Sequence, residues 1–140
     1  MEETVKILVV DDDEVDRMAV KRTLIAAGVK MELSEANGCA EAIATLQQQQ
    51  FDCVFLDYLL PDGDGLGLVQ RIRASGATVP LVVLTGQGDE NIAVQLMKAG
   101  AYDYLSKSQL SVESLSQTLR NAIRLHKAEM AAQEANRLLR

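Results

Sequence analysis

Apolar residues along this chain occur in short runs, and each run is about as long as a β-strand. Longer stretches separate the runs, and in them apolar residues recur at helical spacing. Most of the runs are continuous and rich in Val, Leu or Ile, which is typical of strands that are buried on both faces. We predict strands at Val5–Val10, Met31–Ala36, Cys53–Leu56, Leu81–Leu84 and Tyr102–Leu105, the second having the weakest pattern.

Five helices are predicted, one after each strand. Gly28, Gly76 and Gly100 stand where helix C-terminal caps belong. Strict alternation of strand and helix predicts an α/β fold, with a parallel sheet covered by helices on both faces and right-handed crossovers. The residues expected to share one face of each helix are Val20, Leu24 and Ala27; Ile43 and Leu46; Leu68, Val69 and Ile72; Ile92, Leu96 and Met97; and Leu115, Leu119 and Ile123.

The last segment differs from the others in length. From Ser111 to Arg140 the chain contains neither Pro nor Gly, which predicts a helix longer than the usual globular range. Its first half can pack on the sheet, but its second half cannot all do so. Two interpretations stay open for the second half: a thin heptad seam, or a helix end exposed to solvent. The seam residues are Leu125, Ala128, Ala132, Ala135 and Leu139.

Composition narrows the class of protein. The chain has 140 residues, 48% of them hydrophobic, which suits one domain with a packed core. A net charge of −6 and an aromatic content of 4% argue against direct nucleic-acid binding. No apolar run approaches the roughly 20 residues that a membrane span needs. Cys39 and Cys53 do not suggest a disulfide framework, so we predict a cytoplasmic protein.

Polar residues follow four of the predicted strands. The first strand leads into Asp11, Asp12 and Asp13, and the later strands lead into a carboxylate, a hydroxyl and an ammonium group. In an open parallel sheet the carboxyl ends of the strands face one crevice, so these groups should converge. The three later residues are Asp57, Thr85 and Lys107.

This set of groups suits phosphoryl chemistry. Clustered carboxylates raise one another's pKa unless a cation relieves them. Magnesium prefers carboxylate oxygens and keeps several waters, which leaves positions for phosphate oxygens. A carboxylate can attack phosphorus and form an acyl phosphate, and the transferred group then needs positive charge around it. We therefore predict an aspartate that accepts a phosphoryl group.

The same residues carry a family resemblance. The stretches "ILVVDDD", "VFLDYLLPDGDG", "VVLTGQ" and "KAGAYDYLSKS", with their spacing, resemble the receiver domain of two-component response regulators, in particular the chemotaxis regulators. The resemblance covers about residues 5 to 125. It implies a flavodoxin-like, doubly wound five-stranded sheet with strand order 2-1-3-4-5. We predict a receiver domain over residues 1–125 and, over residues 126–140, a helical connector that continues the fifth helix toward an output domain. The alternative is a single-domain regulator with an unusually long last helix.

Functional roles follow from this resemblance. It implies that Asp57 is the phosphoacceptor and that Mg²⁺, or Mn²⁺, binds Asp12, Asp57 and the backbone carbonyl of Leu59. Asp11 would act on the metal through water. The phosphoryl group would contact Thr85 and Lys107.

Further residues match the family's switch. The resemblance places Tyr104 at the aromatic switch position, where its ring turns inward as Thr85 moves. Gly86 is small enough for the backbone to approach the phosphate. The surface that changes would be formed by the fourth helix, the fifth strand and the fifth helix.

Expected partners also come from the resemblance. The phosphoryl donor would be a histidine kinase or a histidine phosphotransfer protein. The chain would not be an enzyme, beyond catalysing its own phosphorylation and dephosphorylation. The heptad seam predicts a parallel homodimer through Leu125–Leu139, and no membrane or nucleic-acid partner is expected.

The sequence departs from the family pattern at three places. Ser108 follows Lys107 where the family usually has a proline after a cis bond. We predict either a trans bond with a rearranged loop or a strained cis bond. Leu59 cannot position water as polar residues do there, whereas Gln87 holds the other such position, so slow self-dephosphorylation is expected. Asp13 is expected to begin the first helix rather than to bind metal.

Two other classes of protein fit parts of the sequence. "ILVVDDDEV" also fits the motif of haloacid-dehalogenase-type phosphatases, with Asp11 as nucleophile and Asp13 as general acid. That interpretation leaves Asp57 unexplained, and no acidic pair follows Lys107. The other alternative is an interaction module on the receiver fold that works without phosphate.

Overall fold

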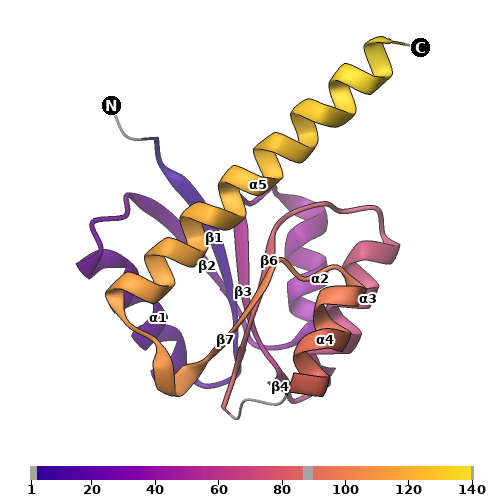
Figure 1. The fold of residues 1–140 in the computed structure, drawn as a ribbon. Coiled ribbons are helices and arrows are strands. Elements are labelled where there is room, and N and C mark those ends of the chain that lie inside the picture. The colour runs from indigo at the N-terminus through magenta and orange to yellow at the C-terminus, as the bar shows by residue number, and fades with distance from the viewer. Residues whose placement is uncertain (1–2, 87–89, 140) are drawn as a thin grey trace.

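The five predicted strands form one parallel sheet. The computed structural model describes residues 3–86 and 90–139 (Figure 1). Within the sheet the strands lie in the order β2-β1-β3-β6-β7, which is 2-1-3-4-5 when the five strands are counted along the chain. The predicted topology is therefore confirmed. The strands are β1 (Val5–Val10), β2 (Met31–Ala36), β3 (Cys53–Asp57), β6 (Leu81–Thr85) and β7 (Asp103–Ser106).

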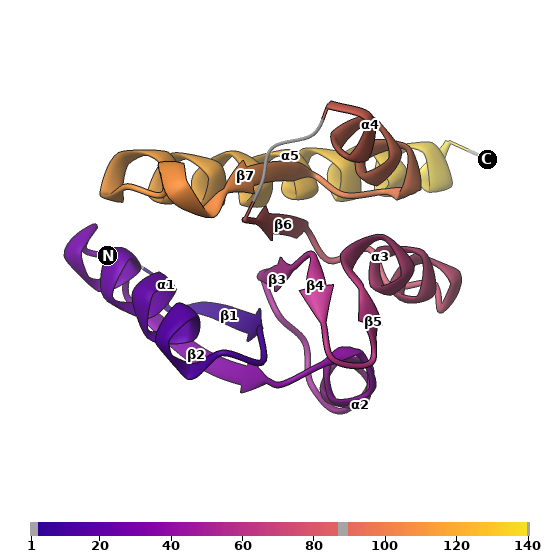
Figure 2. The ribbon, with the colours of Figure 1, turned by 90° about the horizontal axis from the view of Figure 1, so that it is seen from below.

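Helices cover both faces of this sheet, as Figure 2 shows from its end. On one face, α1 (Glu14–Ala26) and α5 (Val112–Leu138) enclose a core that includes Phe55, Leu24 and Leu115. On the other face, α2 (Cys39–Gln48), α3 (Gly65–Ala74) and α4 (Glu90–Ala99) enclose a second core. Neighbouring residues of each strand point to opposite cores, because side chains alternate along a strand.

Burial explains the strength of the sequence pattern. Every residue of β3 and β6 is buried, and these central strands are continuous apolar runs. The edge strand β2 is mostly half-buried or exposed, so it needs fewer apolar residues. Its weak pattern in the sequence is the consequence of its place at the edge.

The helix boundaries follow local chemistry. Asp13 caps α1, and its carboxylate accepts a hydrogen bond from the Val15 N–H at 2.9 Å, so its predicted role at the helix start is confirmed. The glycines predicted as C-terminal caps have positive φ values of 79° at Gly28, 90° at Gly76 and 118° at Gly100. Glycine tolerates this left-handed backbone, which stops the helix.

The long final helix is only partly packed. In its first half, Leu115, Leu119 and Ala122 are buried against the sheet. Further along, the Tyr102 hydroxyl donates to the Glu129 carboxylate at 2.5 Å, and residues 131–139 are exposed. Figure 1 shows this end projecting beyond the sheet. Leu125 is 50% exposed, so the proposed seam lies open in the single chain.

A small hairpin was missed by the sequence analysis. It consists of β4 (Leu59–Leu60) and β5 (Gly63–Asp64), which pair antiparallel between β3 and α3. The Asp62 carboxylate at its tip accepts hydrogen bonds from the Cys39 and Ala40 N–H groups at 2.7 and 3.0 Å. The hairpin is thereby attached to the start of α2. Strands of two residues have no periodicity to detect.

The state of the cysteines and the composition of the helices can also be compared with the sequence predictions. Cys39 and Cys53 are buried and carry free thiols. None of the helices in the described ranges combines the length with the apolar composition that a bilayer crossing requires.

The core predicts a contrast between two adjacent residues of α1. Leu24 is fully buried and Ile25 is 56% exposed. We expect Leu24→Ala to lower the free energy of unfolding by about 2–5 kcal/mol. Ile25→Ala, a matched control, should change it by less than about 0.5 kcal/mol. Urea denaturation followed by circular dichroism checks both values, and equal effects would contradict the described packing.

Candidate functional site

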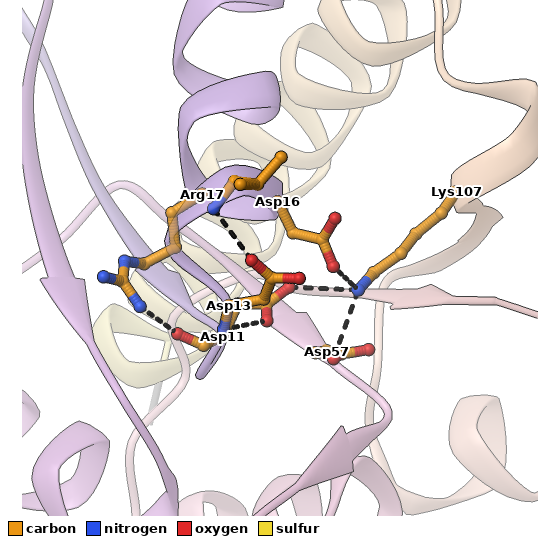
Figure 3. A network of polar contacts seen from close by, with 7 residues as sticks. Asp11, Asp13, Asp16, Arg17, Asp57 and Lys107 are labelled. Atoms are coloured by element: carbon orange, nitrogen blue, oxygen red, sulfur yellow. Dashed lines mark hydrogen bonds and ion pairs between the residues drawn. The ribbon is translucent and has the colours of Figure 1, made fainter.

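Side chains from three strand ends meet at the carboxyl edge of the sheet. Asp11 follows β1, Asp57 ends β3, and Lys107 follows β7. The Lys107 ammonium lies 3.0 Å from the Asp11 carboxylate and 3.2 Å from that of Asp57 (Figure 3). The convergence expected from the sheet topology is confirmed for these three residues.

Asp12 completes a group of three acids. Carboxylate oxygens of Asp11, Asp12 and Asp57 all lie within 4.8 Å of one another. Asp11 is 3% and Asp57 8% exposed, whereas Asp12 is open to solvent. Oxygen ligands with one solvent-facing member suit a hard dication that retains water. The donor set is therefore compatible with magnesium.

Lys107 also contacts an acid that the sequence analysis did not select. The Asp16 carboxylate, in the first turn of α1, lies 2.7 Å from the Lys107 ammonium. Burial alone would lower the pKa of Lys107, but hydrogen bonds to Asp16 and Asp11 and the charge of Asp57 raise it above its usual value. Lys107 is therefore the cation that compensates this cluster.

Asp57 lies where its charge is costly. Burial raises the pKa of its carboxyl group above the usual value, and the charge of Asp11 raises it further. Lys107 and a backbone hydrogen bond from Leu59 act in the opposite direction but do not cancel the shift. A carboxylate that is poorly solvated and held in place is a candidate nucleophile.

Arg17 fixes the loop that carries the acids. Its guanidinium donates to the Asp11 backbone carbonyl at 2.6 Å and to the Asn37 side chain at 3.0 Å. It also pairs with Glu35 at 3.1 Å. The Asp13 N–H donates to the Asp11 carboxylate at 2.9 Å, which sets the direction of that side chain. The sequence analysis missed Arg17 because its main contact is with a backbone oxygen.

The other residues predicted for the site differ in their burial and in their distance from the acidic cluster. Thr85 ends β6 and is buried, one strand from Asp57. The Leu59 side chain is 72% exposed. A side chain at Gly86 would meet open space, so packing does not require glycine there. Tyr104 is half-buried and packs against the core on the α2–α4 face. Gln87 lies outside the described residues.

The segment after Lys107 forms a tight turn, and its ammonium reaches the acidic cluster. No cis peptide bond occurs in the described ranges, so the Lys107–Ser108 bond is trans, which agrees with the first of the two predicted alternatives. Residues Lys107–Gln109 form a 3₁₀ turn. The Ser106 and Ser108 hydroxyls lie 2.8 Å apart across it.

Comparison with known proteins identifies the family. The model of the response regulator receiver domain matches residues 7–120. The chain therefore belongs to the receiver domains of two-component response regulators, which are signalling domains. This membership replaces the phosphatase interpretation of "ILVVDDDEV".

Relatives and solved structures agree. The chain is 36% identical over 137 residues to the response regulator protein PilR of Pseudomonas aeruginosa, covering 96% of this chain and 30% of PilR. It is 35% identical over 130 residues to the response regulator MprA of Mycobacterium tuberculosis, covering 93% of this chain and 55% of MprA. The chain thus spans about half the length of MprA and about a third of the length of PilR.

Solved receiver domains have the same fold. A receiver domain protein from Clostridium thermocellum superposes with a TM-score of 0.78 at 29% identity, covering 89% of this chain and 98% of that one. The beryllofluoride-activated NtrC4 receiver domain dimer superposes with a TM-score of 0.77 at 30% identity, covering 86% of this chain and 98% of that one.

The electrostatics of the site predict a stabilising substitution. In metal-free protein at pH 7 we expect Asp57→Asn to raise the unfolding temperature, because it removes a poorly solvated charge. The raised pKa sets the sign of the pH dependence: wild type takes up a proton on Asp57 as the pH falls, so the advantage of the variant shrinks in acid.

Calorimetry at several pH values measures this difference. Glu32→Gln is a control that removes an exposed acid from β2, and its effect should stay within about 0.5 kcal/mol. An Asp57→Asn protein less stable than wild type at every pH would contradict the prediction.

Proposed function

We propose that this receiver domain accepts a phosphoryl group on Asp57 from a histidine kinase or a histidine phosphotransfer protein. The observation that carries the proposal is the buried Asp57 carboxylate, 3.2 Å from the Lys107 ammonium and within 4.8 Å of two further acids. A nucleophile, a cation and a dication-compatible donor set are thus together at one sheet edge. This arrangement suits phosphoryl transfer.

The proposed chemistry uses the residues of this chain. A carboxylate oxygen of Asp57 attacks phosphorus, the P–N bond to the donor histidine breaks, and its electron pair stays on the imidazole nitrogen. Lys107 and Thr85 stabilise charge on the phosphoryl oxygens. Asp12, Asp57 and the Leu59 carbonyl would hold Mg²⁺ (or Mn²⁺), with Asp11 acting through water. The metal, when bound, supplies positive charge to the same oxygens.

Signal output is proposed to follow the family pattern. Thr85 and Tyr104 would change position on phosphorylation and alter the surface of α4, β7 and α5. That surface already exposes Val94 and Met97 of α4 at 52% and 46%. Leu59 offers no polar group to a hydrolytic water, so the acyl phosphate should be lost slowly. Gly86 would admit the phosphate close to the backbone.

Three wider statements remain predictions. Residues 126–140 are expected to connect the receiver to an output domain, and the length of the curated relatives is compatible with this. The cytoplasm is the expected compartment. A parallel homodimer through α5 is expected, and a dimer of the NtrC4 receiver domain is among the similar structures.

Labelling with acetyl phosphate tests the phosphoacceptor. We expect Mg²⁺-dependent incorporation of one phosphoryl group in wild type and none in Asp57→Asn. Asp11→Asn should be labelled more slowly, by roughly tenfold or more, because it weakens metal binding without removing the nucleophile.

The outcomes separate the alternatives. Label that persists in Asp57→Asn but disappears in Asp11→Asn would assign the nucleophile to Asp11. If no variant, wild type included, takes up label with any small phosphodonor or histidine kinase, the chain would be a phosphate-independent module. Circular dichroism of each variant verifies folding.

The exposed seam of α5 predicts self-association. Its two leucines, Leu125 and Leu139, are 50% and 85% exposed, and a parallel partner helix would bury such residues. We expect Leu125→Glu with Leu139→Glu to shift the chain from dimer to monomer in analytical ultracentrifugation at high concentration. A wild-type chain that is monomeric with and without fluoroberyllate would contradict the dimer.

A further inference from the structure

The Asp16 carboxylate is the nearest of three acids to the Lys107 ammonium. Its distance is 2.7 Å, against 3.0 Å for Asp11 and 3.2 Å for Asp57. Figure 3 shows Asp16 approaching the ammonium from α1, while Asp11 and Asp57 approach from the strand ends. The pair therefore joins the first turn of α1 to the segment after β7.

Lys107 has no donor to spare in this arrangement. An ammonium group carries three N–H donors, and three carboxylates surround this one. A phosphoryl oxygen can receive a hydrogen bond from Lys107 only after one carboxylate has lost its own.

The three contacts of Lys107 respond differently to phosphorylation. A phosphorylated Asp57 has used an oxygen to bond phosphorus, so its contact with Lys107 passes to the new group. Asp11 belongs to the group of acids that would surround a dication, whereas Asp16 lies outside that group. Asp16 therefore keeps its full charge after metal and phosphoryl group have bound, and it continues to attract the Lys107 ammonium away from the phosphoryl oxygens.

We propose that Asp16 is a positioning residue that holds Lys107 in the unphosphorylated protein and competes with the phosphoryl group for its ammonium. The proposal rests on the proposed function, because it concerns how tightly the Asp57 site holds a phosphoryl group. Its consequence is a weaker hold on that group and a balance shifted toward the unphosphorylated state.

A simpler explanation of Asp16 gives the experiment its control. Acids are favourable in the first turn of any helix, because they interact with the helix dipole. Asp13 begins the same helix, but its carboxylate accepts from the Val15 N–H. Asp13→Asn removes the same charge from the same turn and keeps a capping side chain. An effect that runs through Lys107 appears at Asp16 and not at Asp13.

The test is binding of fluoroberyllate, which mimics a phosphoryl group on an aspartate, at saturating Mg²⁺. Amide chemical shifts report it, since the chain contains no Trp. We expect half-saturation of Asp16→Asn at about three- to fivefold lower fluoroberyllate than wild type, the range that a partly exposed ion pair allows. Asp13→Asn should stay within about twofold, and Asp16→Glu, which keeps the charge, should resemble wild type.

A second measurement tests the contact itself. In protein without Mg²⁺ or fluoroberyllate, thermal unfolding of Asp16→Asn, Lys107→Ala and the double variant forms a cycle. Residues that interact show non-additive effects. Additive effects would overturn the claim that Asp16 holds Lys107.

The outcomes also separate this inference from the proposed function. Half-saturation of Asp16→Asn equal to or above wild type, or an equal gain in Asp13→Asn, would overturn the competition while the phosphoacceptor stands. A wild-type protein that shows no response to Mg²⁺ with fluoroberyllate would overturn the proposed function and this inference with it.

Discussion

The site depends on one cation among several acids. Asp11 and Asp57 are buried, and two like charges in such positions would repel each other strongly without compensation. Lys107 supplies that compensation through direct contacts with both and with Asp16. The net charge of the cluster nevertheless remains negative, and this makes the site receptive to a dication.

The sheet explains why these groups meet at all. Residues 11, 57 and 107 are far apart in the chain, but parallel strands bring their carboxyl ends to one edge. The register is specific: Asp57 pairs with Leu84, and Thr85 pairs with Ser106 directly before Lys107. Two buried cores, one on each face, hold these strands in place, so the geometry of the site rests on rigid elements.

The sequence predicted those parts of the structure that repeat or that follow strands. The parallel sheet, the helix number and the convergence of Asp11, Asp57 and Lys107 followed from alternation and from the rule for strand ends, whereas the strand order followed from the family resemblance. Contacts made by helix side chains did not follow. Asp16 looks like any acid in a first turn, and Arg17 acts on a backbone carbonyl that no residue pattern encodes.

Short elements escaped prediction for a related reason. The hairpin of β4 and β5 has two residues in each strand, too few for a period. The carboxylate of Asp62 attaches it to α2 by two backbone hydrogen bonds, and this contact depends on the final fold.

One strand joins the site to the far part of α5. Lys107 directly follows β7, and Tyr102 directly precedes it. The Tyr102 hydroxyl donates to Glu129, beyond the buried half of α5. The strand between Tyr102 and Lys107 has four residues, so the two contacts lie at opposite ends of one short element. The phosphoryl chemistry proposed for one end of β7 and the contact with the projecting helix at its other end thus share this strand.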